Sequence, residues 1–313
     1  MENKQTNQEL IGEYLNFYQH SPQSVKMRKS SLNYFFEEKH FGYNGDIFEI
    51  NTKELKNYFI YLKNLNSISI QTRKNKWLIL VSFLSFVMED NEDFNIAIPR
   101  RRISWNGFIP QENPNSNSDV IADEDEIERI CNFLEETNFK HYLIFRMMIE
   151  NGIRKGSLIT AKYTEVNLNY RQLHIKKGKT GEKIYTFSED YARKLEIYLK
   201  ERKKIKTDHE YLFITKSNNK YSLRTFNLIL KGDSDKNIGI LAKLGITKNI
   251  TCKTFRSTLN TLRKKKMGCD NDTAKILLGH SVPDVNINSY TKYDYEWLRE
   301  LSDKYNPYKE LNL

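Results

Sequence analysis

The sequence predicts a mainly α-helical protein of two domains with one small antiparallel β-sheet. Apolar residues recur at helical spacing along most of the chain, and only one pair of segments has the pattern of short strands. A length of 313 residues gives room for about two domains. Hydrophobic residues make up 39% of the chain, and 13 Gly and 6 Pro are too few for a collagen-like or disordered polypeptide. We therefore expect two domains, each with a buried core.

The first domain, residues 1–98, is expected to be an all-α bundle. Apolar residues follow helical spacing in three stretches, 24–41, 55–62 and 69–88. The first residues are polar and acidic and do not resemble a signal peptide. The longest apolar run, 78–88, is far shorter than the roughly 20 residues that span a bilayer. We expect a cytoplasmic protein that does not bind membranes.

The segment 99–118 interrupts the helical pattern and is expected to be an interdomain linker. It combines prolines, an Asn/Ser cluster and three consecutive arginines, Arg100, Arg101 and Arg102. These arginines either form a solvated turn or contact a phosphate backbone. We favour DNA binding because a basic domain follows.

The second domain, residues 119–313, is expected to be helical around the small sheet. Asp123 and Glu126 have the spacing of a capping box at the start of its first helix. The further helices expected are 142–150, 189–204, 223–230, 253–266 and 272–278. Segments 172–175 and 184–187 are expected to pair as a hairpin, with Lys179 at its tip.

Most of the positive charge lies in the second domain. The formal net charge is +10, of which residues 1–118 carry +1 and the rest of the chain carries +9. Basic residues cluster in 176–183, 202–206 and 263–266, with Tyr and Phe between them. Positive charge alone attracts any polyanion, but this clustering favours a nucleic acid as partner. We interpret 263–266 as a solvated helix face, which is also open to contact with backbone phosphate, and we assign it no chemistry.

The three cysteines, Cys131, Cys252 and Cys269, are odd in number and lack Cys-x-x-Cys spacing. No histidine lies near any of them in a ligand pattern. We therefore expect neither a disulfide framework nor a structural zinc.

Five short motifs in the second domain resemble those of the tyrosine recombinase family, which includes phage integrases and Xer-type resolvases. In chain order they are NGIRKGSL (151–158), GKTGEKI (178–184), KTFR (253–256), LLGHS (277–281) and NSYT (288–291). Each motif is weak alone, whereas their order and spacing together are specific. The resemblance covers residues 119–300 and implies an α+β catalytic domain. The first domain is similar to the family's helical, SAM-like core-binding domain.

The resemblance implies that Tyr290 is the nucleophile. A phenol that attacks the phosphorus forms a 3′-phosphotyrosyl bond, which keeps the phosphodiester energy without a cofactor. Arg154 and Arg256 are implied to hold the non-bridging oxygens, a role suited to a planar guanidinium. No metal and no ATP are expected.

Three more side chains are implied in the same site. Lys179 would protonate the leaving 5′-oxygen as general acid. Lys253 stands where the family usually has histidine, and as a fixed cation it can still donate to a phosphate oxygen. His280 resembles the family's second histidine, which hydrogen-bonds the scissile phosphate.

Two departures from the family pattern concern this site. Ser157 stands where the family often has an acidic residue, three positions after Arg154. Tyr290 lies ten residues after His280, where nine is the commoner distance. Tyr293 is therefore the second candidate nucleophile, and Tyr295 is a weaker one.

The function expected is site-specific recombination or integration of double-stranded DNA through a Holliday junction. The enzyme would be a monomer or dimer off DNA and a homotetramer on paired sites. The alternative is a catalytically inactive DNA-binding regulator of the same fold. A topoisomerase or telomere resolvase is disfavoured, because these usually carry long additional regions. The amphipathic end segment with Trp297, Leu298 and Leu301 either closes its own core or packs on a neighbouring subunit.

Overall fold

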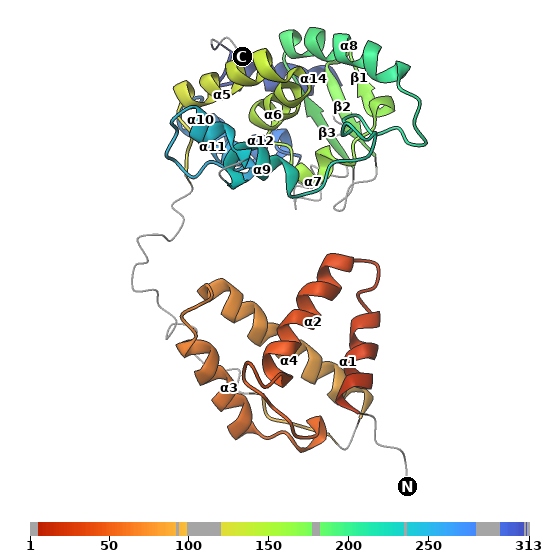
Figure 1. Cartoon of the computed structure of the whole chain (residues 1–313), viewed down its shortest axis with the longest axis vertical. Coiled ribbons are helices and arrows are strands. Elements are labelled where there is room, and N and C mark those ends of the chain that lie inside the picture. The colour runs from red at the N-terminus through yellow and green to blue at the C-terminus, as the bar shows by residue number, and fades with distance from the viewer. Residues whose placement is uncertain are drawn as a thin grey trace. The chain divides into compact units, whose positions relative to one another are not determined.

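The structure is a computed structural model that describes residues 6–91, 94–98, 120–176, 182–234, 237–279, 295–309 and 311. The chain divides into two compact units, Met1–Ser116 and Asn117–Leu313 (Figure 1). Within the described ranges, no helix is long and apolar enough to cross a membrane.

The first unit is a helical bundle. Its elements are α1 (Asn7–Asn16), α2 (Pro22–Phe36), the 3-10 turn Ile47–Glu49, α3 (Thr52–Asn64) and α4 (Ile70–Asp90). Helix α4 packs against the other three helices. The core is rich in aromatic rings, and Phe35, Tyr58 and Phe83 are completely buried. The bundle expected for the first domain is thus confirmed.

Two details of this bundle differ from the sequence patterns. Helix α1 carries no strong apolar signal, but Thr6 and Glu9 form a capping box at its start. The second helix ends at Phe36 rather than near residue 41, because the chain folds back there. Phe41 still joins the core, since its ring stacks on that of Phe35 with 5.5 Å between centroids.

In the second unit, helices and small sheets surround a central helix, α6 (Phe139–Asn151). Its helices are α5 (Glu124–Thr137), α6 (Phe139–Asn151), α7 (Lys155–Leu158), the 3-10 turn Tyr163–Glu165, α8 (Glu189–Lys204), α9 (Thr225–Lys231), α10 (Ile240–Lys243), α11 (Cys252–Lys265), α12 (Asn271–Leu277) and α14 (Tyr295–Lys304). Its strands are β1 (Val166–Asn167), β2 (Gln172–Ile175), β3 (Lys183–Thr186), β4 (Gly232–Ser234) and β5 (Asn237–Ile238). Helix α6 packs against α5, α8 and α11, and residues 142–151 of it are all buried (Figure 1). The expected helices are present, with ends that differ by up to three residues.

The main sheet has the antiparallel order β1-β2-β3. Leu173 lies opposite Tyr185, and Ile175 lies opposite Lys183. The two expected hairpin strands are therefore confirmed to within one residue. Strands β4 and β5 form a second, two-stranded sheet that the sequence patterns did not mark.

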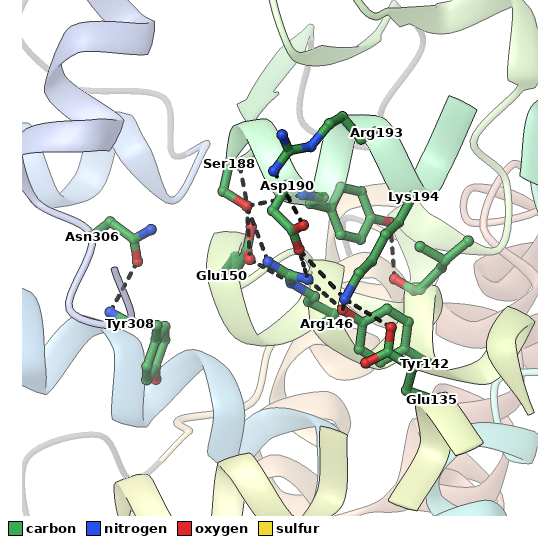
Figure 2. Close-up of polar contacts among 12 residues, drawn as sticks. Glu135, Tyr142, Arg146, Glu150, Ser188, Asp190, Arg193, Lys194, Asn306 and Tyr308 are labelled. Carbon is green, nitrogen blue, oxygen red and sulfur yellow. Dashed lines mark hydrogen bonds and ion pairs between the residues drawn. The ribbon is translucent and has the colours of Figure 1, made fainter. Parts of the chain in front are cut away.

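Two buried side chains of α6, Arg146 and Glu150, form an ion pair (Figure 2). The Nε of Arg146 lies 2.7 Å from Oε1 of Glu150, and its Nη1 lies 2.6 Å from Oδ2 of Asp190. The Ser188 hydroxyl donates to Oε1 of Glu150 at 3.0 Å. Because buried charges need partners on every side, these contacts fix the last turn of α6 against the start of α8.

The interpretation of residues 263–266 as a solvated helix face is wrong for Arg263. Residues 264–266 are exposed as expected, but Arg263 is only 1% exposed. Its Nη2 donates to the Glu150 carbonyl at 3.3 Å, and its Nε donates to the Tyr305 carbonyl at 3.2 Å. Tyr308 is buried in the same unit. The residues after α14 thus pack on their own chain in this structure.

Candidate active site

Arg154 follows a tight turn at the end of α6. Gly152 caps α6 in the left-handed conformation, with φ 60° and ψ 25°, which glycine adopts without steric cost. Arg154 is then the N-cap of α7, and its side chain is exposed. The turn places this arginine outside the core that α6 helps to form.

Arg256 is half-buried and joins the ends of two helices. From the second turn of α11, its Nη1 donates to the Gly152 carbonyl, and its Nη2 donates to the Leu278 carbonyl at 3.0 Å. These carbonyls end α6 and α12, where helices leave acceptors unpaired. Burial, with a smaller contribution from Arg154, lowers the pKa of Arg256 to about 10, so the guanidinium is still a cation at neutral pH. A guanidinium has five N–H donors, so two carbonyls do not exhaust it.

Arg154, Lys253 and Arg256 line one hollow of about 920 Å³. Its other walls come from α7, β2, the start of α9 and the first turn of α11. Lys253 is exposed and stands three residues before Arg256, so both lie on the same face of α11. The N-terminus of a helix itself favours an anion. The structure thus brings these three residues of the sequence motifs to one place.

Strand β3 adds Lys183, which belongs to the basic cluster 176–183 and to the GKTGEKI motif but was given no role of its own. Its side chain is 6% exposed, and its Nζ donates to the Gly279 carbonyl at 2.9 Å. Burial lowers the pKa of Lys183, and Arg154 and Arg256 lower it further. In the sequence, Lys183 stands just before the expected strand 184–187, and only the fold brings its side chain into the core near the arginines.

Tyr185, two residues further along β3, lies on the same side of the strand. Its ring packs under Gly279, whose missing Cβ would come within 3.2 Å of the phenol. Burial raises the pKa of Tyr185, and Arg256, Arg154 and Ser157 partly offset this effect. Among the described residues, the hydroxyl has no partner in good hydrogen-bonding geometry, but Ser157 and Arg256 are near enough to lower its pKa. Ser157, at the usual acidic position, therefore lies beside this phenol.

The remaining expected site residues lie outside the described residues. These are Lys179, His280, Tyr290 and Tyr293, together with Arg100, Arg101 and Arg102. Tyr295 is described, at the start of α14. Its ring packs against Tyr170 and His174, with centroids 5.4 Å and 6.3 Å away, and it is not among the residues that line the hollow.

The geometry defines a class of site, a hollow lined by cations that is suited to an anion. Four cations line the hollow, namely Arg154, Lys155, Lys253 and Arg256. The buried Lys183 adds a further positive charge that Arg154 and Arg256 destabilise, and a bound phosphate would relieve this repulsion. No group of three or more metal-ligating side chains occurs in the described ranges. The three cysteines are buried thiols.

Comparisons with known proteins identify the family. The model of the phage integrase family matches residues 121–296, and the chain belongs to this family. It is 26% identical over 298 residues to the tyrosine recombinase XerA of Pyrococcus horikoshii, covering 93% of this chain and 90% of that protein. Among solved structures, it resembles the Tn1549 transposon integrase in complex with transposon right end DNA, with a TM-score of 0.68, 15% identity and coverage of 95% and 98% of the two chains. A lambda integrase tetramer bound to a Holliday junction gives a TM-score of 0.59 at 16% identity, covering 93% and 80%. The protein is a tyrosine recombinase that acts on DNA.

Proposed function

We propose that this chain cuts and rejoins specific DNA sites with Tyr290 as the nucleophile, through a covalent 3′-phosphotyrosyl intermediate. The observation that carries the proposal is the hollow that Arg154, Lys253 and Arg256 share. Its size and charge suit a phosphodiester, and it lies in the unit that the family model matches.

In the proposed reaction, the Tyr290 phenol gives its proton to water, and its oxygen forms a bond to phosphorus as the bond to the 5′-oxygen breaks. Negative charge grows on the two non-bridging oxygens, which Arg154 and Arg256 hold. Arg256 is anchored to two backbone carbonyls, so its orientation is set by the fold. Loss of one such preorganised donor typically lowers a rate by about 10²–10³.

We assign the proton transfer and the remaining contacts to the phosphate to three further residues. Lys179 protonates the departing 5′-oxygen as general acid. Lys253 and His280 donate to oxygens of the same phosphate. In the return step, a 5′-hydroxyl from the partner strand attacks the phosphotyrosyl bond and releases the tyrosine.

On DNA, we propose that residues 1–98 form the core-binding domain, 99–118 the linker and 119–313 the catalytic domain. Arg100, Arg101 and Arg102 contact the DNA backbone, which adds to a salt-dependent affinity. Two protomers occupy each site, and two sites form a homotetramer that passes through a Holliday junction. The lambda integrase named above has that assembly and a similar fold, which supports this arrangement. The protein works in the cytoplasm and is associated with the nucleoid when bound to DNA.

The experiment is a suicide-substrate assay with nicked duplexes that cover the borders of the genetic element encoding the protein. The nick lets a short strand diffuse away after cleavage, so a covalent adduct accumulates and migrates slowly on a denaturing gel. We expect this adduct with the natural protein and with the control variant Tyr293→Phe, but not with Tyr290→Phe.

Three results would contradict parts of the proposal. An adduct with Tyr290→Phe that is lost in Tyr293→Phe would make Tyr293 the nucleophile. DNA binding without any adduct on any border would favour the catalytically inactive regulator. An adduct that requires added metal would contradict the metal-independent chemistry proposed here.

A further inference from the structure

The side chain of Lys183 is buried in a way that is uncommon for lysine. It begins β3, pairs with Ile175 across the sheet and is 6% exposed. A buried ammonium must be hydrogen-bonded, because its desolvation is otherwise too costly. The described residues give it no ion pair, and its hydrogen bond goes to the Gly279 carbonyl.

That carbonyl belongs to the C-terminal turn of α12, which two cations hold. Lys183 binds the Gly279 carbonyl at 2.9 Å, and Arg256 binds the preceding carbonyl, that of Leu278, at 3.0 Å. Cations are favoured at a helix C-terminus, where carbonyls lack partners. Gly279 itself has φ 63°, and the Tyr185 ring packs against the place where a Cβ would lie. The turn is therefore fixed from α11 on one side and from β3 on the other.

The next residue in the chain is His280. The Gly279 carbonyl is part of the peptide bond that joins Gly279 to His280, so a contact that holds this carbonyl also restrains that peptide bond. Lys183 is close to Arg154 and Arg256, since both lower its pKa. In the sequence, Lys183 follows Lys179 by four residues, and the carbonyl that it holds directly precedes His280.

We propose that Lys183 is a positioning residue of the cleavage reaction, which acts by holding the Gly279 carbonyl and so the start of the segment that carries His280. This inference rests on the function proposed above. It gives Lys183 a role separate from the proton transfer assigned to Lys179.

The first test compares Lys183→Met and Lys183→Arg with the natural protein. Lys200→Met is the control, because the Lys200 side chain is 69% exposed on α8. Single-turnover adduct formation is measured on a nicked duplex at saturating protein, and affinity is measured by fluorescence anisotropy on an intact duplex. We expect Lys183→Met to cut roughly 10–100 times more slowly with a Kd within about twofold of the natural value. Arginine at this position can donate to the same carbonyl and should recover part of the rate.

The second test separates positioning from proton transfer. A substrate with a 5′-bridging sulfur leaves as a thiolate and needs no general acid. We expect this sulfur to restore cleavage by Lys179→Met but not by Lys183→Met. In a His280→Ala background, Lys183→Met should slow cleavage by less than about threefold, because a residue that acts through His280 has little left to position.

Several results would overturn the inference. Natural rates for Lys183→Met would exclude any role in cleavage, and rescue by the bridging sulfur would make Lys183 the general acid instead. An undiminished effect without His280 would exclude positioning through that residue. If the natural protein forms no adduct, the proposed function itself fails, so the two failures are distinguishable. Thermal unfolding of each variant is measured. If the methionine variant unfolds at the assay temperature, Lys183→Gln replaces it, because its shorter neutral side chain lacks the ammonium that holds the Gly279 carbonyl.

Discussion

Gly152→Ala is the substitution whose effect the structure defines most closely. Gly152 has φ 60°, a conformation that costs roughly 1–2 kcal/mol for a residue with a Cβ. The added Cβ would also lie 2.7 Å from Cδ2 of Leu278 and 3.3 Å from Cγ of Arg256. Overpacking of this kind adds about 1–3 kcal/mol. The free energy of unfolding of the second unit should therefore fall by roughly 2–5 kcal/mol.

Gly245→Ala is the matched control. Gly245 has φ 64°, but nothing lies within 4 Å of its added Cβ. Only the backbone cost applies, so the loss should be about 1–2 kcal/mol. The assay is urea unfolding of the full chain, followed through the second unit, with adduct formation measured on the same preparations. Because Leu278 and Arg256 must both move in Gly152→Ala, its cleavage rate should fall by more than its unfolded fraction explains. Equal losses of stability in the two variants would refute the reasoning.

Three further predictions follow from individual contacts. Arg146→Met should lower the free energy of unfolding by about 3–5 kcal/mol in urea titrations, because it leaves Glu150 buried without its cation, and adding Glu150→Gln should recover part of the loss. Arg256→Lys should lower the adduct rate by at least about 10²-fold at unchanged DNA affinity, since an ammonium cannot bridge two carbonyls and a phosphate in one plane; a tenfold weaker Kd would contradict this. Burial, with Lys140 and Lys216, lowers the pKa of His141 to about 4. The unfolded chain therefore binds the proton more tightly, and stability should fall as pH drops from 6.5 to 4. Unfolding midpoints at pH 7 and pH 4 should differ less in His141→Gln.

The sequence predicted those parts of the site that local patterns encode. Gly152 marked the end of α6, and the spacing of Lys253 and Arg256 placed both on one helix face. Strands β2 and β3 also followed from two short strand-like segments on either side of a Thr-Gly turn. Each of these features depends on residues within a few positions of one another, which is why a single sequence contains them.

The contacts that the sequence did not predict join segments that are far apart in the chain. In the sequence, Lys183 is one of several lysines in a basic cluster. Its hydrogen-bond acceptor is a carbonyl at the end of α12, nearly a hundred residues later in the chain, which no local pattern reveals. Arg263 stands among exposed lysines, and only its face on α11 directs it to the Glu150 carbonyl. Likewise, Arg146 and Glu150 have the spacing of a surface ion pair, but α5, α8 and α11 cover the helix that carries them.

The two arginines of the site are held differently, and this difference bears on how the site is assembled. Arg256 is fixed to carbonyls at the ends of α6 and α12, so its place is set when the unit folds. Arg154 is exposed at a helix N-cap, and Lys253 is exposed on the first turn of α11. A donor that is fixed in this way needs no ordering when a phosphate arrives. The fold thus provides one guanidinium that two backbone carbonyls preorganise.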